Sequence, residues 1–156
     1  MITSINDMNM EKEFIRVRSV KDIIISITLL AAGCALVMVP AGAGVNVLGF
    51  FLIFAGILLG LILRTGYKDV QTGGIYLKKE HFFQQAMNQV ISSAIASRPD
   101  SLDLSERDKG NAVRLDVYFS KKTGKAYLQL FEYVPYKYEP CSKMFEHEID
   151  NVGDLI

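Results

Sequence analysis

Apolar residues form one long block in the first half of the chain. Residues 23–63 include no Asp, Glu, Lys, Arg or His, and only the segment Pro-Ala-Gly-Ala-Gly at 40–44 interrupts them. A hydrocarbon core about 30 Å thick needs roughly 20 apolar residues at about 1.5 Å each. The runs 20–39 and 45–63 have nearly that length, and backbone groups in lipid must bond within their own segment. The pattern predicts a membrane hairpin of two transmembrane helices.

Apolar residues are spaced differently after the apolar block. Over residues 80–97, pairs of apolar residues recur every four positions, which is typical of an amphipathic helix. His81 would lie in its first turn, and Pro99 would end it. The opposite face is polar but uncharged, which favours a helix that covers a sheet over one that binds membranes electrostatically. The apolar pairs are Phe82 and Phe83, Ala86 and Met87, Val90 and Ile91, and Ala94 and Ile95.

The pattern of apolar and polar residues predicts β strands in the second half of the chain. Residues 113–120 alternate apolar and polar, 121–124 form a turn ending in Gly124, and 125–134 make a second strand. A short first strand is expected at 75–77, and an edge segment at 136–139 between two prolines. With the helix on one face of an antiparallel sheet, this is a small α+β domain.

The predicted organisation has four parts. Residues 1–19 form an N-terminal segment, interpreted as a short disordered lead-in that ends in basic anchors, and 20–63 form the hairpin. Residues 64–79 are a linker with the first short strand, and 80–156 are the α+β domain. The last residues, 146–154, are mixed and charged.

Charge balance bears on partners and topology. Lys plus Arg and Asp plus Glu both number 17, so no strong field favours nucleic acid. Basic residues flank the hairpin on both sides, and the loop between the helices has none, so the positive-inside rule predicts that both termini are cytoplasmic. The flanking residues are Lys12, Arg16, Arg18 and Lys21 before the hairpin and Arg64 and Lys68 after it. The compact layout favours a bacterial inner membrane.

Two processing signals compete with the first transmembrane helix. Ala41-Gly42-Ala43 resembles a signal-peptide cleavage site, and the residues before Cys34 resemble a lipobox. Against both, Asp22 abuts the apolar run and a second full-length span follows at once. With only Cys34 and Cys141 present, no disulfide framework is expected.

Small residues recur within the apolar runs. Gly33 lies in a small-residue patch of the first helix, whereas Gly49, Gly56 and Gly60 recur along the second, the last two as a GxxxG pair. Such residues let helix backbones approach closely. These four positions are predicted to pack helices, and packing within one hairpin and packing between protomers remain open alternatives.

Aromatic residues gather near the end of the second hairpin strand and just after it. Tyr127, Phe131 and Tyr133 share one strand face, followed by Tyr136 and Tyr138. If the leucines of this strand pack under the helix, the aromatic face is a candidate surface for a partner. The alternative is that these rings shield the outer side of the sheet.

Local motifs for chemistry are weak. Glu146-His147-Glu148 would direct the histidine opposite to the glutamates on a strand, so no metal site is expected. Lys122-Thr123-Gly124-Lys125 joins two strands and lacks the spacing of a phosphate-binding loop. Cys141 has no local histidine partner of recognisable motif. No catalytic residue, metal or cofactor is predicted, and the protein is not expected to be an enzyme.

The expected function is that of an integral membrane protein, an accessory or scaffolding subunit whose domain binds other proteins. Its partners would be the lipid bilayer and a protein partner or further copies of itself. The alternative is a ligand-gated effector that oligomerises through its hairpin and permeabilises the membrane.

Overall fold

The computed structural model describes residues 12–156, and these form two compact units. One unit is Ile15–Lys68, which contains the two apolar helices. The other is Asp69–Ile156 together with the described residues up to Phe14. The hairpin is therefore inserted into the chain of the domain, since residues on both sides of it belong to the same compact unit.

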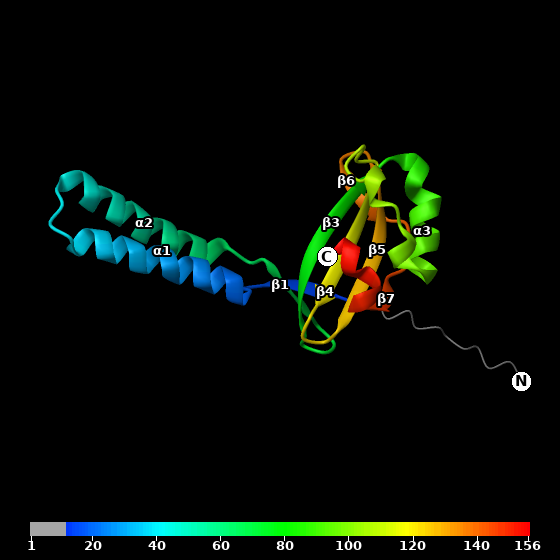
Figure 1. The fold of residues 1–156 in the computed structure, drawn as a ribbon, viewed down its shortest axis with the longest axis horizontal. Coiled ribbons are helices and arrows are strands. Elements are labelled where there is room, and N and C mark those ends of the chain that lie inside the picture. Colours follow the sequence, from blue (N-terminus) through cyan, green and yellow to red (C-terminus); the bar gives the residue numbers. More distant parts are fainter. Residues whose placement is uncertain (1–11) are drawn as a thin grey trace, which may run out of the picture. The chain divides into compact units, whose positions relative to one another are not determined.

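Two long helices dominate the first unit. Strand β1 (Phe14–Val17) leads into α1 (Val20–Met38), a short loop leads to α2 (Ala43–Ile62), and β2 (Gly66–Asp69) follows. The helices run side by side, as the ribbons labelled α1 and α2 in Figure 1 show. Gly42 begins α2 at a φ of 101°, a conformation that suits glycine. Both helix bounds agree with the predicted apolar runs to within about two residues, a difference expected at helix ends.

The N-terminal segment differs from its prediction. Phe14–Val17 form β1, hydrogen-bonded to β2, where a disordered lead-in was expected. Ile15 and Val17 alternate with Arg16 and Arg18, which suits a strand. The strand that pairs with β1 follows the hairpin in the chain, so the local pattern does not reveal it. The remainder of the predicted lead-in, residues 1–11, lies outside the described residues.

An antiparallel sheet forms the second unit. Strands β3 (Ile75–Phe83), β4 (Val113–Ser120), β5 (Lys125–Val134) and β6 (Lys137–Pro140) are neighbours in that order. Strand β7 (Phe145–Glu148) pairs with the first half of β5, along the edge whose second half pairs with β6. The β4–β5 hairpin has the predicted bounds, and Gly124 has a φ of 69° in its turn. The strand expected at 136–139 corresponds to β6.

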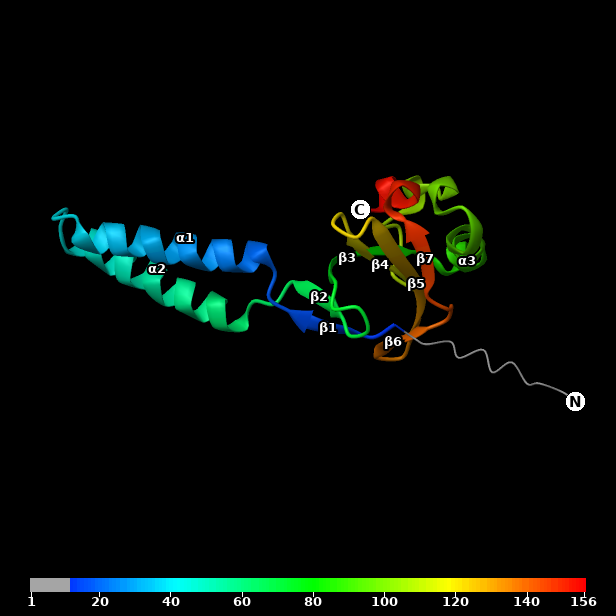
Figure 2. The same ribbon diagram turned by 90° about the horizontal axis from the view of Figure 1, so that it is seen from below.

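Helix α3 (Asn88–Ser97), preceded by a 3₁₀ turn at Gln85–Met87, covers one face of this sheet (Figure 2). Further 3₁₀ turns lie at Pro99–Ser101, Leu104–Glu106 and Ile149–Leu155. Val152 and Leu155 of the last turn belong to the core, although the terminal segment reads as mixed and charged. The core is completed by Phe83, Ile91, Ala94, Ile95, Leu102, Val113, Leu115, Val117, Phe119, Ala126, Leu128 and Leu130.

The predicted start of the helix, at residue 80, is wrong. Residues 80–83 belong to β3, and the α-helix begins at Asn88. The apolar spacing fits a helix, but β3 pairs with β4 from Leu77 opposite Phe119 to Phe83 opposite Val113. That ladder satisfies backbone groups and buries Phe83, and local periodicity cannot reveal it. His81 is therefore a buried strand residue, and its Nε2–H donates to the Leu155 carbonyl at 2.7 Å.

Candidate interaction surfaces

All four predicted packing glycines lie where α1 and α2 of the same hairpin meet. A Cβ added at Gly33 would stand 2.7 Å from the Gly49 carbonyl oxygen, and one at Gly49 would stand 2.9 Å from the Gly33 carbonyl oxygen. A Cβ at Gly56 would lie 3.1 Å from the Leu30 amide nitrogen. The absent side chains thus let the two backbones touch. This contact lies within one hairpin, which was one of the two alternatives.

The outer surface of the hairpin is apolar. In each helix only 11% of the most apolar window is buried, whereas the core helix of a soluble domain is mostly buried. Both helices are long and apolar enough to cross a membrane. An exposed apolar surface of this size marks contact with lipid or with another protein. Its exposed side chains are Val20, Ile23, Ile24, Ile27, Met38, Val39, Val47, Leu48, Phe50, Phe51, Phe54, Ile57, Leu58, Leu61 and Ile62.

A polar lock joins the two ends of the hairpin. Ser19 and Asp22 form a capping box at the start of α1. Thr65, which follows α2, donates from its amide to Asp22 Oδ2 at 2.8 Å and from its hydroxyl to Asp22 Oδ1 at 2.6 Å. Asp22 is buried beside an apolar helix, yet both of its oxygens are satisfied. Its role is therefore structural. In the sequence, Asp22 argues only against a signal peptide, because no local pattern shows that it meets Thr65.

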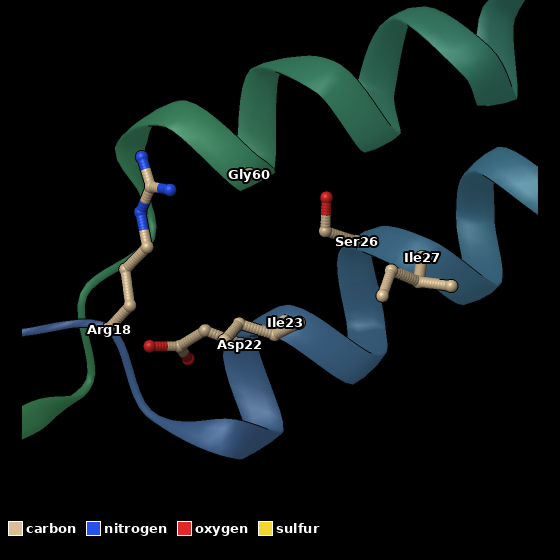
Figure 3. Close-up of a pocket in the computed structure, with 6 residues that line it drawn as sticks. All are labelled: Arg18, Asp22, Ile23, Ser26, Ile27 and Gly60. Atoms are coloured by element: carbon tan, nitrogen blue, oxygen red, sulfur yellow. The ribbon is translucent and has the colours of Figure 1, made fainter.

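Close to this lock, a small cavity of about 110 Å³ opens between the helices. Figure 3 shows Ser26 directed toward Gly60 and the Arg18 side chain extending along the end of α2. The Ser26 hydroxyl donates to the Gly56 carbonyl at 2.7 Å, and a Cβ at Gly60 would stand 2.6 Å from that hydroxyl oxygen. Gly60 therefore makes room for a buried hydrogen bond between the helices.

In the domain, residues before the hairpin cover part of the sheet face opposite α3. Phe14 stacks on Tyr118 with ring centroids 4.3 Å apart. It meets Tyr76 edge-on at 5.4 Å and the tilted ring of Tyr127 at 5.9 Å. Tyr127 is consequently only 4% exposed. One of the predicted surface aromatics is thus covered by a segment of the same unit.

An ion pair holds this segment in place. Lys12 Nζ lies 2.7 Å from Asp69 Oδ2 and 2.7 Å from the Tyr127 hydroxyl, and it stands over the Tyr127 ring at 4.1 Å. Asp69, whose side chain is fully buried, also accepts from the Thr72 hydroxyl and the Gln71 amide. Burial by itself would raise the pKa of Asp69, but these hydrogen bonds outweigh it and hold the pKa below its ordinary value.

A second charged group lies on the same face. Asp116, almost fully buried, lies 3.0 Å from Lys78 Nζ and 2.8 Å from Arg114 Nε. Burial raises the pKa of Asp116 despite both cations. The Arg114 guanidinium in turn stacks on Phe131 and Tyr138, 4.7 Å from each ring centre. The alternation over residues 113–120 placed Arg114 and Asp116 on one strand face, but it gave no sign that they form a network with Lys78.

The predicted aromatic surface therefore divides into two parts. Tyr127 and Phe131 belong to packed clusters, whereas Tyr133 and Tyr136 are 51% and 98% exposed. Tyr138 is half-buried and meets Tyr133 edge-on at 5.3 Å. Phe82 of β3 packs on Tyr138 at 6.2 Å, a neighbour that the misassigned helix concealed. We call Phe82, Tyr133, Tyr136 and Tyr138 the aromatic tip.

The two histidines have structural partners. His147 on β7 points away from its neighbouring glutamates, as the strand pattern predicted, and its ring N–H donates to the Ile95 carbonyl. Among residues 12–156, no three His, Cys, Asp or Glu side chains gather as a metal site would require. Burial raises the pKa of the Cys141 thiol, which disfavours a reactive thiolate.

An open groove of about 460 Å³ lies on the other face of the sheet, the one that α3 packs against. Its apolar side chains include Leu77 and Phe119, and two lysines, Lys79 and Lys121, also line it. Comparison of the chain with known protein families, with curated proteins and with solved structures finds no match.

Proposed function

We propose that this protein is a membrane-anchored, non-enzymatic accessory or scaffolding subunit whose domain binds another protein through the aromatic tip. The apolar outer surface of the hairpin supports the membrane anchor, because a bilayer would cover it without a further protein. The basic residues that flank both helices, with none in the loop, support an orientation with both hairpin ends in the cytoplasm of a bacterial inner membrane.

The observation that carries the binding role is the conformation of Tyr136. Its φ is 71°, in the left-handed region, and its side chain is 98% exposed. A residue with a Cβ pays about 1–2 kcal/mol in that region, whereas glycine adopts it freely. The exposed ring gains almost nothing from burial. The stability of the fold by itself would therefore favour glycine at position 136. Contact with a partner protein explains why a tyrosine is found there instead.

The rest of the aromatic tip is held in place. The Tyr136 amide donates to the Tyr133 hydroxyl at 3.3 Å, and the Tyr138 hydroxyl donates to the Asn111 carbonyl at 2.7 Å. Rings that are already ordered lose little conformational entropy on binding. Tyrosines are enriched among the residues that dominate interface energies. The tip therefore has the composition and order of a protein-binding surface.

The test is affinity purification of the full-length protein in mild detergent, with the mass of the complex measured and co-purifying proteins identified. Three forms are compared: the natural chain, Tyr136→Gly and Asp108→Gly. Asp108 is an exposed residue with a similar φ of 63°, so Asp108→Gly relieves the same backbone conformation without removing a ring.

We expect a stoichiometric partner with the natural chain and with Asp108→Gly. Tyr136→Gly should weaken capture by about 30-fold, the effect of losing a contact worth about 2 kcal/mol, while the domain stays at least as stable. Equal capture by Tyr136→Gly would exclude the aromatic tip as the binding surface. A homo-oligomer without a partner would contradict the accessory role and favour the membrane-permeabilising effector.

A further inference from the structure

The face of the sheet beneath α3 extends beyond the elements that cover it. Ile91 and Ile95 of α3 pack over the core, and the last 3₁₀ turn reaches His81 through the Leu155 carbonyl. The strands continue past this point, since Leu77 of β3 is paired with Phe119 of β4. Leu77 and its neighbour on the same face, Ile75, remain 45% and 46% exposed. The result is the apolar floor of the open groove.

Cationic side chains line the same groove. Lys79 follows Leu77 on the same face of β3, and Lys121 begins the turn after β4. Within residues 12–156, neither lysine makes an ion pair or a side-chain hydrogen bond. The lining side chains include no Asp or Glu. The lining residues are Ile75, Leu77, Lys79, Phe119, Ser120, Lys121 and Ile156.

An apolar floor with a cationic edge fits a ligand that has an anionic head and an apolar chain. Acidic phospholipids have this chemistry, and lysines close to an anionic lipid surface bind it electrostatically. Ile75 lies 13 residues after Ile62, the last residue of α2. At about 3.4 Å per residue, this length of chain reaches at most about 45 Å. A domain tethered so near a bilayer meets lipid at a high effective concentration, so weak binding suffices.

We propose that this groove binds the headgroup and upper acyl chain of an acidic phospholipid in the membrane that holds the hairpin. The proposal rests on the membrane anchoring proposed above. An acidic protein segment would meet the same charges but lacks the tethering that favours lipid.

The test uses the absence of tryptophan from the chain. Leu77→Trp places a single reporter in the groove, and Val90→Trp places one at an exposed position of α3 outside it. Each full-length variant is reconstituted into phosphatidylcholine vesicles that contain a minor fraction of acyl-brominated phosphatidylglycerol. A parallel set contains the same fraction of acyl-brominated phosphatidylcholine. Bromine quenches tryptophan on contact, so the fluorescence reports which lipid occupies the groove.

We expect phosphatidylglycerol to quench Leu77→Trp more strongly than phosphatidylcholine does, and to quench Val90→Trp no more than phosphatidylcholine does. Adding Lys79→Glu and Lys121→Glu should lower the ratio of docked to undocked domain by at least about 30-fold, because losing each lysine costs about fivefold and each glutamate adds repulsion. Arg98→Glu with Lys143→Glu makes the same change in net charge outside the groove and should leave the quenching of Leu77→Trp intact.

Two results would overturn the lipid site. In the first, phosphatidylglycerol quenches Leu77→Trp no more than phosphatidylcholine does. In the second, the preference for phosphatidylglycerol remains after the charges of both groove lysines are reversed. Flotation of the vesicles separates these results from failure of the anchor. Protein that does not float with lipid contradicts membrane anchoring itself, whereas floating protein with an unquenched groove reporter contradicts only the lipid site.

Discussion

Replacing Lys12 by Met removes the cation that pairs with a fully buried carboxylate. Lys12 Nζ contacts Asp69 Oδ2 and the Tyr127 hydroxyl, both at 2.7 Å. Methionine keeps most of the apolar stem, so packing against the aromatic rings is largely retained. The substitution therefore isolates the loss of the charge.

The expected loss in the free energy of unfolding is about 3–4 kcal/mol. Removing one member of a buried ion pair costs about 3–5 kcal/mol because the other charge is left without compensation. Asp69 keeps two hydrogen bonds, from the Thr72 hydroxyl at 2.7 Å and the Gln71 amide at 2.9 Å, which place the cost at the lower end. Loss of the cation–π contact with Tyr127 adds about 0.5–1 kcal/mol. The sum of the two costs stays within the range of about 3–5 kcal/mol.

The cost should depend on pH. Because the folded pKa of Asp69 lies below its ordinary 3.8, the stability from this carboxylate is present above about pH 3.8 and is lost as the pH falls through the folded pKa. Without Lys12 the pKa of Asp69 rises. The difference in stability between the natural protein and Lys12→Met should therefore be greatest at neutral pH and narrow on acidification.

The assay is urea denaturation of the full-length protein in mild detergent, with hydrogen exchange of the β4 and β5 amides reporting on the domain. Lys143→Met, which alters an exposed lysine, is the control and should change stability by less than about 0.5 kcal/mol. Adding Asp69→Asn to Lys12→Met should recover part of the loss, since the unpaired charge disappears. A cost for Lys12→Met that matches the control, or one that is independent of pH, would refute this explanation.

Two further substitutions test the packing of each unit. Gly33→Ala places a methyl group 2.7 Å from the Gly49 carbonyl oxygen and 2.8 Å from the Ile53 amide nitrogen, and should destabilise the helix pair by about 1–3 kcal/mol. Gly44→Ala, which meets nothing within 4 Å, is the control, and thermal unfolding of the helices in detergent measures both. Leu128→Ala removes a fully buried core side chain and should cost about 2–5 kcal/mol in urea denaturation of the domain, whereas a cost below about 1 kcal/mol would contradict its place in the core.

Local pattern predicts an element well where its periodicity has one interpretation. The β4–β5 hairpin alternates strictly around a glycine turn, and its bounds are as predicted. Residues 80–83 fit both a helix repeat and a strand, and only the ladder with β4 decides between them. The same limit applies to the aromatic residues, because Tyr127 is covered by Phe14 and Lys12, which lie far from it in sequence.

The sequence by itself determined two helices long and apolar enough to cross a membrane, and a following antiparallel sheet with a helix. Each of these follows from composition and period within a short window, where side-chain hydrophobicity dominates. The tertiary structure alone decided that residues on both sides of the hairpin complete one domain, which tyrosines are exposed, and where buried charges pair. These properties arise from contacts between segments that are distant in the sequence. The spacing of apolar residues within a short window does not show which of those segments meet.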